Sequence, residues 1–369
     1  MAELQALAAR VLLAAFVLSF LFGAIAQRTH FCTMGALSDA YVMGDTTRLR
    51  QWALAAGVAI LGFWALVALG QLDPGKTLYG GRRWTWLSAI VGGGLFGFGM
   101  VLASGCGSKN LVRIGGGSLK SLVVFLALGL AAFATLKGIT AVLRVATVDR
   151  VALEFPAPAL LPVGLGALSG LPLGTAGLIA ALVLGGGLVL WALSSRGFRT
   201  FDNLLAGLGI GLVICGAWWV SGHLGYLAEH PETLEEAFVA SNSGRAEALS
   251  FVAPIAYTLD WLLFFSDRSK LLTIGVVSVL GVIAGSAAMA LLRRDFRWEG
   301  FGGTEDVANH LFGAALMGVG GVTAMGCTIG QGLSGLSTLS ATSFVAVAGI
   351  VGGALLAFRY QAWRVERME

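Results

Sequence analysis

Long stretches without any charged residue are the feature that most limits how this chain can fold. Six segments contain no Lys, Arg, Asp or Glu: 51–72, 84–108, 155–195, 203–228, 271–292 and 307–358. A helix needs about 20 apolar residues to cross the hydrocarbon core of a bilayer, and most of these segments are that long. Two of them, 155–195 and 307–358, are long enough for two passes. We therefore expect an all-α, polytopic transmembrane protein.

Counting spans along the chain gives about nine. Charged residues make up 12 % of the sequence, about half the share that is typical of soluble domains. The first apolar stretch lacks the basic flank and the cleavage site of a signal peptide, so we expect it to remain as a span. The expected spans lie near 4–26, 51–71, 85–104, 119–136, 174–195, 202–222, 271–292, 308–326 and 341–358.

Two parts of the chain repeat each other. Residues 92–106 align with residues 313–327 with eight identities in fifteen positions. The identical residues are Gly92, Leu95, Gly97, Gly99, Val101, Ala103, Gly105 and Cys106, which recur as Gly313, Leu316, Gly318, Gly320, Val322, Ala324, Gly326 and Cys327. In each copy an apolar helix runs into a Gly-Cys break, and a second short apolar segment follows. Glycine-interrupted hydrophobic segments at matching places in two halves are typical of transporter binding sites.

The distribution of basic residues predicts an orientation. Arg residues within 196–199, 293–297 and 359–367 mark cytoplasmic ends, whereas the acidic stretch 229–247 predicts an external segment. The N-terminus is then outside and the C-terminus cytoplasmic, although Lys76, Arg82 and Arg83 on the external side depart from the rule. The two breaks would enter from opposite sides, so we expect an inverted repeat whose broken helices meet at a central constriction.

We expect one membrane transport domain over residues 1–369. Its half-repeats are 1–195 and 200–369, and the second contains an external acidic loop at about 223–265.

The two Gly-Cys breaks supply the candidate site. Irregular backbone at membrane depth is tolerated only where protein buries it or where it lines a cavity. A thiol there offers a weak donor and a polarisable atom, and the start of the next helix offers free N–H groups that suit an anion. The pathway candidates are Cys106 and Cys327, and the supporting candidates are Gly105, Gly107, Ser108, Lys109, Gly326, Thr328 and Gln331.

Each candidate also has a simpler interpretation. A buried cysteine often acts only as a small hydrophobic side chain, but the repeated Gly-Cys context favours function for Cys106 and Cys327. Lys109 is equally well explained as a cation that reaches the membrane interface. For Cys215, inside an apolar helix, we favour a structural role.

A third break surrounds Cys32. The segment 27–36 also follows an apolar span and interrupts it with polar residues. Cys32 is therefore a third pathway candidate, with His30 and Thr33 as supporting candidates. His30 is more simply explained as an interfacial polar residue.

Several kinds of function have no sequence support. The four cysteines lie far apart, without a C-x-x-C or a Cys/His cluster, so we expect no metal site and no cofactor. No phosphate-binding G-x-x-x-x-G-K-[ST] motif is present, so we expect no ATP hydrolysis and no catalytic residues. No basic run is long enough to bind nucleic acid.

At these motifs the chain resembles the YeeE/YedE family of bacterial inner-membrane proteins. The blocks that carry the resemblance are 28–39, 104–115 and 325–335, and it extends from about residue 15 to residue 358. The resemblance implies thiosulfate uptake, with Cys32, Cys106 and Cys327 along a central pathway and S–H hydrogen bonds to the passing anion. It also implies a cytosolic sulfurtransferase as a plausible partner.

The leading hypothesis is therefore a transporter of thiosulfate or a closely related small sulfur oxyanion. Transport of another sulfur or selenium species is one alternative. A membrane thiol–disulfide oxidoreductase that uses Cys106 and Cys327 is the other, and it would need both sulfurs within disulfide distance.

Overall fold

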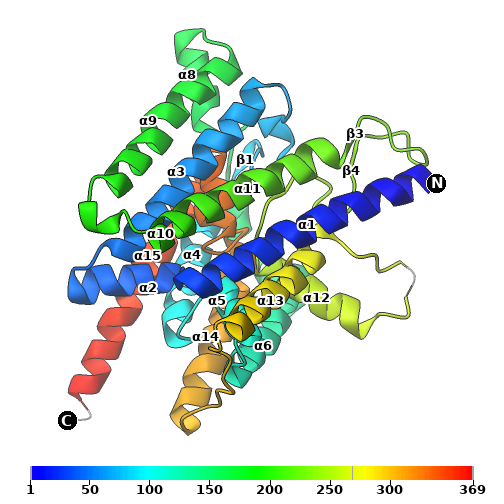
Figure 1. The fold of residues 1–369 in the computed structure, drawn as a ribbon. Helices are drawn as coiled ribbons and strands as arrows, with labels where there is room; N and C mark the ends of the chain where they lie inside the picture. Colours follow the sequence, from blue (N-terminus) through cyan, green and yellow to red (C-terminus); the bar gives the residue numbers. More distant parts are fainter. Residues whose placement is uncertain (1, 268, 368–369) are drawn as a thin grey trace.

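Helices make up nearly all of the regular structure, as Figure 1 shows for the computed structural model, which describes residues 2–267 and 269–367. In this part of the chain the strands are two antiparallel pairs of two-residue strands, β1 (Arg83–Trp84) with β2 (Leu153–Glu154) and β3 (Tyr226–Leu227) with β4 (Ala237–Phe238). The expected all-α class is confirmed.

The helices fall into two groups along the chain. Those of the first half are α1 (Ala2–Thr29), α2 (Thr33–Ser38), α3 (Thr47–Ala68), α4 (Trp86–Leu102), α5 (Gly107–Gly115), α6 (Leu119–Lys137), α7 (Ile139–Ala146), α8 (Leu161–Ser169) and α9 (Leu173–Leu193). Those of the second half are α10 (Phe201–Leu204), α11 (Ile210–Trp219), α12 (Ala253–Leu263), α13 (Ile274–Leu292), α14 (Thr304–Thr323) and α15 (Ala341–Glu366). Short π-helices extend some of them: η1 (Asp39–Met43), η5 (Leu205–Gly209), η6 (Val220–Leu224) and η7 (Gly330–Gly335).

Eight helical segments of the described chain are long and apolar enough to cross a membrane. They are Ala2–Met43, Thr47–Ala68, Trp86–Gly115, Leu119–Lys137, Leu173–Leu193, Phe201–Leu224, Ile274–Leu292 and Ala341–Glu366. The ninth expected span, 308–326, corresponds to α14, which is a helix but is not one of these eight. Glu305, Asp306 and the buried His310 in its first turns make it more polar than the others.

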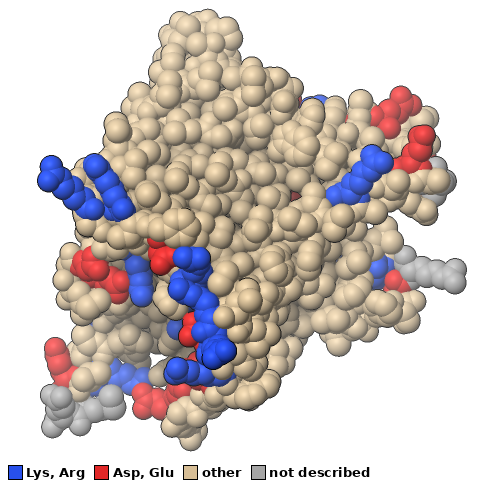
Figure 2. All heavy atoms as spheres, in the orientation of Figure 1, with Lys and Arg blue, Asp and Glu red and all other residues tan. Residues whose placement is uncertain are grey.

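Charged side chains lie toward two ends of the molecule. In Figure 2 a broad band without Lys, Arg, Asp or Glu separates these ends, as expected for a surface that contacts lipid. Many of the Lys and Arg side chains in this view gather toward the end at which the C-terminus lies.

Two repeat helices, α4 and α14, form the centre of the fold. A Cβ atom on Gly92 would lie 2.7 Å from the carbonyl oxygen of Gly320, and one on Gly99 would lie 2.6 Å from that of Gly313. These glycines therefore allow two backbones to approach more closely than any side chain would permit. In the sequence alignment Gly92 matches Gly313 and Gly99 matches Gly320, so the two contacts exchange equivalent residues.

The contacts that α4 and α14 make with other helices also involve equivalent residues of the two repeats. Gly97 of α4 packs against α15, where its Cβ would meet the carbonyl oxygen of Ile350 at 2.0 Å. The aligned residue Gly318 of α14 packs against α6, where its Cβ would meet the carbonyl oxygen of Leu128 at 2.6 Å. α15 and α6 thus occupy corresponding places around the central pair.

The connection between η6 and α13 is only partly a surface loop. It carries β3, β4 and α12, but Ala246, Leu249, Phe251 and Val252 are almost completely buried. Phe251 lies in the main hydrophobic core together with Phe22, Cys106 and Cys327. The second half of the expected acidic loop therefore reaches the centre of the protein.

Candidate functional site

The helix ends before Cys106 and Cys327 have the same backbone geometry. At the end of α4, Gly105 N–H donates to Met100 O at 2.8 Å and Ser104 N–H donates to Val101 O at 3.2 Å. At the end of α14, Gly326 N–H donates to Gly321 O at 2.8 Å and Met325 N–H donates to Val322 O at 3.1 Å. Both ends are Schellman motifs, in which a left-handed residue closes the helix.

The left-handed residue is not glycine in either motif. Ser104 has φ 54° and Met325 has φ 58°, and His30, which also lies two residues before a cysteine, has φ 53°. Non-glycine residues rarely adopt this conformation, which costs about 1–2 kcal/mol. In all three breaks expected from the sequence, a left-handed residue therefore changes the direction of the chain two positions before the cysteine.

Each of the three sulfur atoms contacts a polar group of the helical turn that follows it. Cys32 Sγ accepts from Gly35 N–H at 3.3 Å, and Cys327 Sγ accepts from Gly330 N–H at 3.4 Å. Cys106 caps α5, and its sulfur lies 3.2 Å from Ser108 Oγ. All three cysteines are buried, and all four cysteines of the chain are free thiols. A sulfur that accepts from the backbone still has its own S–H to donate.

Two amide side chains hold the turns in place. Asn110 Nδ2 donates to the carbonyl oxygens of Gly105 and Cys106 at 3.0 and 3.1 Å. Gln331 donates to the carbonyl oxygen of Ala324 and accepts from Ser343 Oγ at 2.6 Å. Gln331 corresponds to Asn110 in the repeat, so Asn110, which the sequence analysis missed, matches it better than Lys109. Both amides are engaged with protein groups, which makes them positioning residues.

A small cavity brings the three cysteine segments together. It has a volume of about 10 Å³, and Cys32 and Thr33 line it together with Ser108, Lys109 and Ile329. That volume suffices for about one water molecule. Cys106 and Cys327 both belong to the main hydrophobic core, and neighbours of both, Ser108 and Ile329, line this cavity. The closed centre of the protein is therefore lined by residues from all three breaks.

Two hydroxyl groups beside the thiols make no hydrogen bond within the described part of the chain. They belong to Thr33 and Thr328, the residues after Cys32 and Cys327, and both oxygens are buried. Leaving a buried donor unpaired costs about 1–3 kcal/mol, so these two hydroxyls are unsatisfied polar groups directly beside the thiols.

The remaining sequence candidates have different places. Lys109 lines the central cavity, as an ion-attracting role requires. His30 is exposed and is not one of the residues that line this cavity, so its contribution is the left-handed turn. Gly107 is the first residue of α5. Cys215 lies in α11, and its sulfur would lie 2.2 Å from a Cβ on Gly62 of α3, which agrees with the structural role expected for it.

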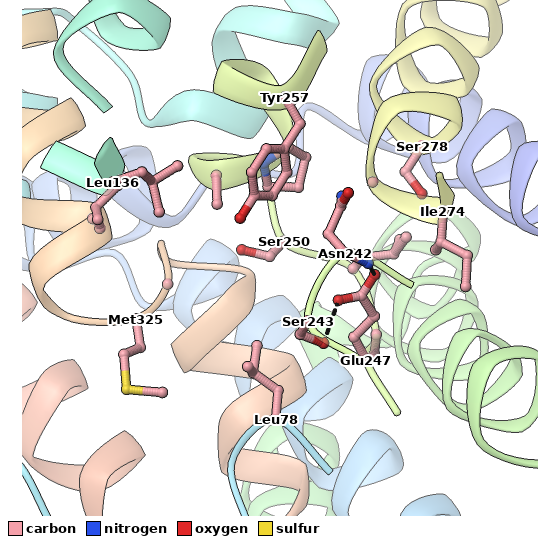
Figure 3. A pocket seen from close by; sticks show the side chains of 18 of the residues that line it. Leu78, Leu136, Asn242, Ser243, Glu247, Ser250, Tyr257, Ile274, Ser278 and Met325 are labelled. Carbon is pink, nitrogen blue, oxygen red and sulfur yellow. Dashed lines mark hydrogen bonds between the residues drawn. The ribbon is translucent and has the colours of Figure 1, made fainter. Parts of the chain in front are cut away.

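A larger cavity adjoins the Cys327 break. Its volume is about 200 Å³, and Met325 and Gly326, the residues directly before Cys327, line one side. Glu247, Ser250 and Tyr257 line it from the partly buried connection (Figure 3). Tyr79 contacts the turn after Cys327, because its hydroxyl donates to Gly330 O at 2.6 Å. Neither Tyr79 nor Glu247 carries a motif, so nothing in the sequence pointed to them.

The fold and the site define a polytopic membrane protein whose interrupted helices meet around a small central cavity, lined by Cys32 and by residues that follow Cys106 and Cys327. The family model described as "Sulphur transport" matches residues 28–356, and the chain belongs to that family.

Individual relatives agree with this assignment. The chain is 26 % identical to "Thiosulfate transporter TsuA" of Escherichia coli, over 88 % of this chain and 87 % of the relative. It is 27 % identical to "Thiosulfate transporter TsuA" of Spirochaeta thermophila, over 89 % of this chain and 93 % of the relative. It is also 33 % identical to "Probable transporter YedE" of Escherichia coli, over 25 % of this chain and 21 % of the relative. The resemblance to the YeeE/YedE family is thus confirmed.

Proposed function

We propose that this protein takes up thiosulfate, or a closely related small sulfur oxyanion, through a pathway formed by Cys327, Cys106 and Cys32. Membership of the sulphur transport family and full-length similarity to two thiosulfate transporters support the substrate. The observation that carries the pathway is the meeting of three cysteine segments around one central cavity.

The order of the cysteines follows from their neighbours. The large cavity reaches Met325 and Gly326, so Cys327 is the first thiol on that side. Cys106 shares the main hydrophobic core with Cys327, and the residues that follow it, Ser108 and Lys109, line the central cavity with Cys32, so we place Cys106 in the middle. Cys32 lies with Lys109 at the central cavity and is the last.

The chemistry of this path suits a soft dianion. The thiols and the unpaired hydroxyl groups of Thr33 and Thr328 are neutral donors, which bind an anion loosely enough to release it. The polarisable sulfur atoms suit the terminal sulfur of thiosulfate. Because the central cavity holds about one water molecule, an ion of five heavy atoms passes only when the cysteine turns move apart.

We infer an inverted arrangement of the halves 1–195 and 200–369 within one membrane transport domain. The exchanged contacts of Gly92, Gly99, Gly313 and Gly320 support a pseudo-twofold axis between α4 and α14. In this proposal the protein lies in a bacterial inner membrane with its N-terminus outside and its C-terminus in the cytoplasm. The basic side chains near the C-terminal end support this orientation (Figure 2). A cytosolic sulfurtransferase would consume the imported ion.

Two alternative functions would require different properties of the site. Transport of another sulfur or selenium anion would use the same path and differs only in the substrate. A thiol–disulfide oxidoreductase would cycle a Cys106–Cys327 bond, but both residues are free thiols and the named relatives are transporters.

Growth distinguishes these possibilities. A bacterium that lacks its own sulfate and thiosulfate importers should grow on thiosulfate as sole sulfur source when it produces this protein. The same host with an empty vector should not grow, and no growth despite normal membrane levels of the protein would rule out thiosulfate uptake. Growth on another sulfur anion alone would identify the substrate among the alternatives.

A further inference from the structure

The large cavity beside Cys327 contains one acidic residue, Glu247, directly on the proposed route of an anion (Figure 3). The cavity volume of about 200 Å³ exceeds that of engineered cavities that bind benzene, which measure about 150 Å³. The cavity can therefore hold a small oxyanion before it meets the first thiol. A fixed negative charge at this place would repel that ion.

Glu247 is held by neutral groups alone within the described part of the chain. One carboxylate oxygen accepts from Asn242 N–H at 3.2 Å, and the other accepts from Ser243 Oγ at 2.9 Å. Its own N–H donates to Ser221 Oγ at 3.1 Å. Three hydrogen bonds thus fix this residue in place, and no Lys, Arg or His of residues 2–267 and 269–367 forms a salt bridge with it.

Few other charged or titratable groups face Glu247. Arg144 of α7 lines the cavity but pairs with Asp149 at 3.2 Å. Tyr257 of α12 and Tyr79 contribute neutral phenols. Arg245, on the same connection, donates to Thr77 O at 3.4 Å. α13 contributes Ser278, α14 contributes Gly321 and Val322, and the turn after α14 contributes Met325; none of these side chains titrates.

A second titratable group lies nearby, across Ala246. His223 lines a neighbouring hollow together with Lys76, which pairs with Glu236. His223 is therefore the neighbouring ionisable side chain that a matched variant has to replace.

We propose that Glu247 is a protonation-controlled gate, which admits the anion to Cys327 when its carboxyl group is neutral and repels it when ionised. This proposal adds a control step to the proposed uptake of thiosulfate, and it rests on that proposed function.

The direction of the pH effect follows from the surroundings of the carboxyl group. Glu247 lies in the connection after the span Phe201–Leu224, outside the membrane-spanning segments. Burial raises the pKa of Glu247, while the hydrogen bonds from Ser243 and Asn242 partly oppose that rise. As the external pH rises through this elevated pKa, Glu247 loses its proton and uptake falls. Thiosulfate itself remains a dianion over the same range.

The test is the initial rate of labelled thiosulfate uptake into proteoliposomes at equal internal and external pH. Equal pH removes any proton gradient as a driving force. For the wild type we expect the rate to fall from about pH 5.5 to about pH 8, by up to about tenfold per pH unit above the pKa of Glu247. Glu247→Gln should transport at a rate that does not change with pH and should exceed the wild type at the alkaline end. Glu247→Asp should keep a pH dependence with a shifted midpoint.

Two matched variants test whether the pH dependence of uptake comes from Glu247. Glu232→Gln removes an exposed carboxylate from the same connection, and His223→Gln removes the neighbouring histidine; both should keep the wild-type pH profile. A Glu247→Gln protein that keeps the wild-type profile, or that is inserted but inactive at every pH, overturns the gate and leaves the proposed function intact. A wild type that takes up no thiosulfate at any pH overturns both.

Discussion

Three residues with positive φ, His30, Ser104 and Met325, set the direction of the chain before each pathway cysteine. Their side chains cannot be the reason for this conformation, since they are a histidine, a serine and a methionine. For Ser104 and Met325, the Schellman hydrogen bonds at the ends of α4 and α14 and the amide side chains of Asn110 and Gln331 hold this conformation. The local strain therefore sits beside the atoms that would have to move during transport.

Substitution at Met325 tests this strain. Met325→Gly should raise the free energy of unfolding by about 1 kcal/mol or less, because glycine tolerates the left-handed conformation but loses more entropy on folding. Met325→Val should lower it, since a β-branched residue is least compatible with positive φ. Thermal unfolding of the detergent-purified variants measures both. Equal midpoints for the glycine and valine variants would show that the turn is not strained.

At the scale of the elements, close glycine contacts hold the broken helices against their neighbours. The alignment of 92–106 with 313–327 located these glycines, because both copies repeat the same spacing. It could not tell which helix each glycine faces. Gly97 contacts Ile350 of α15, which is more than 200 positions away in the sequence. Gly318 contacts Leu128 of α6, which is 190 positions away.

Alanine substitutions within α4 test this packing. Gly97→Ala would place a Cβ 2.0 Å from the carbonyl oxygen of Ile350, so we expect a loss of about 1–3 kcal/mol in stability. Gly94→Ala, one turn away, meets no atom within 4 Å and should gain up to about 1 kcal/mol from the better helix propensity of alanine. The thermal midpoints of the two variants should move in opposite directions, and a shared direction would contradict the packing described for α4.

For the whole molecule, the sequence was sufficient to predict the all-α membrane class, whereas the cysteine pathway stays a prediction. Uncharged runs identified the spans, and the Gly-Cys repeats identified Cys106 and Cys327. The sequence did not predict a place in the site for Tyr79, Asn110 or Glu247, because each belongs to a contact or a cavity that only the folded chain creates. Conversely, His30 attracted attention as a polar residue near Cys32, yet its side chain is exposed.

The proposed orientation is a property of the whole molecule and can be measured separately from transport. A fluorescent protein fused to the C-terminus should fluoresce in the bacterial cytoplasm, because that end carries Arg359, Arg364 and Arg367. Alkaline phosphatase fused to the same end should be inactive. Active phosphatase at the C-terminus would reverse the sides assigned to the two cavities.

The central claim is that the anion crosses the protein through the thiol-lined centre, and initial uptake of labelled thiosulfate by Cys106→Ala proteoliposomes tests it most directly. Cys215→Ala is the matched control, because it removes a thiol that packs against α3 away from the path. The account predicts that Cys106→Ala loses at least about 90 % of the wild-type rate, which is a change of about 1.4 kcal/mol or more in the barrier, while Cys215→Ala keeps most of it. Wild-type uptake by a correctly folded Cys106→Ala protein would contradict the account.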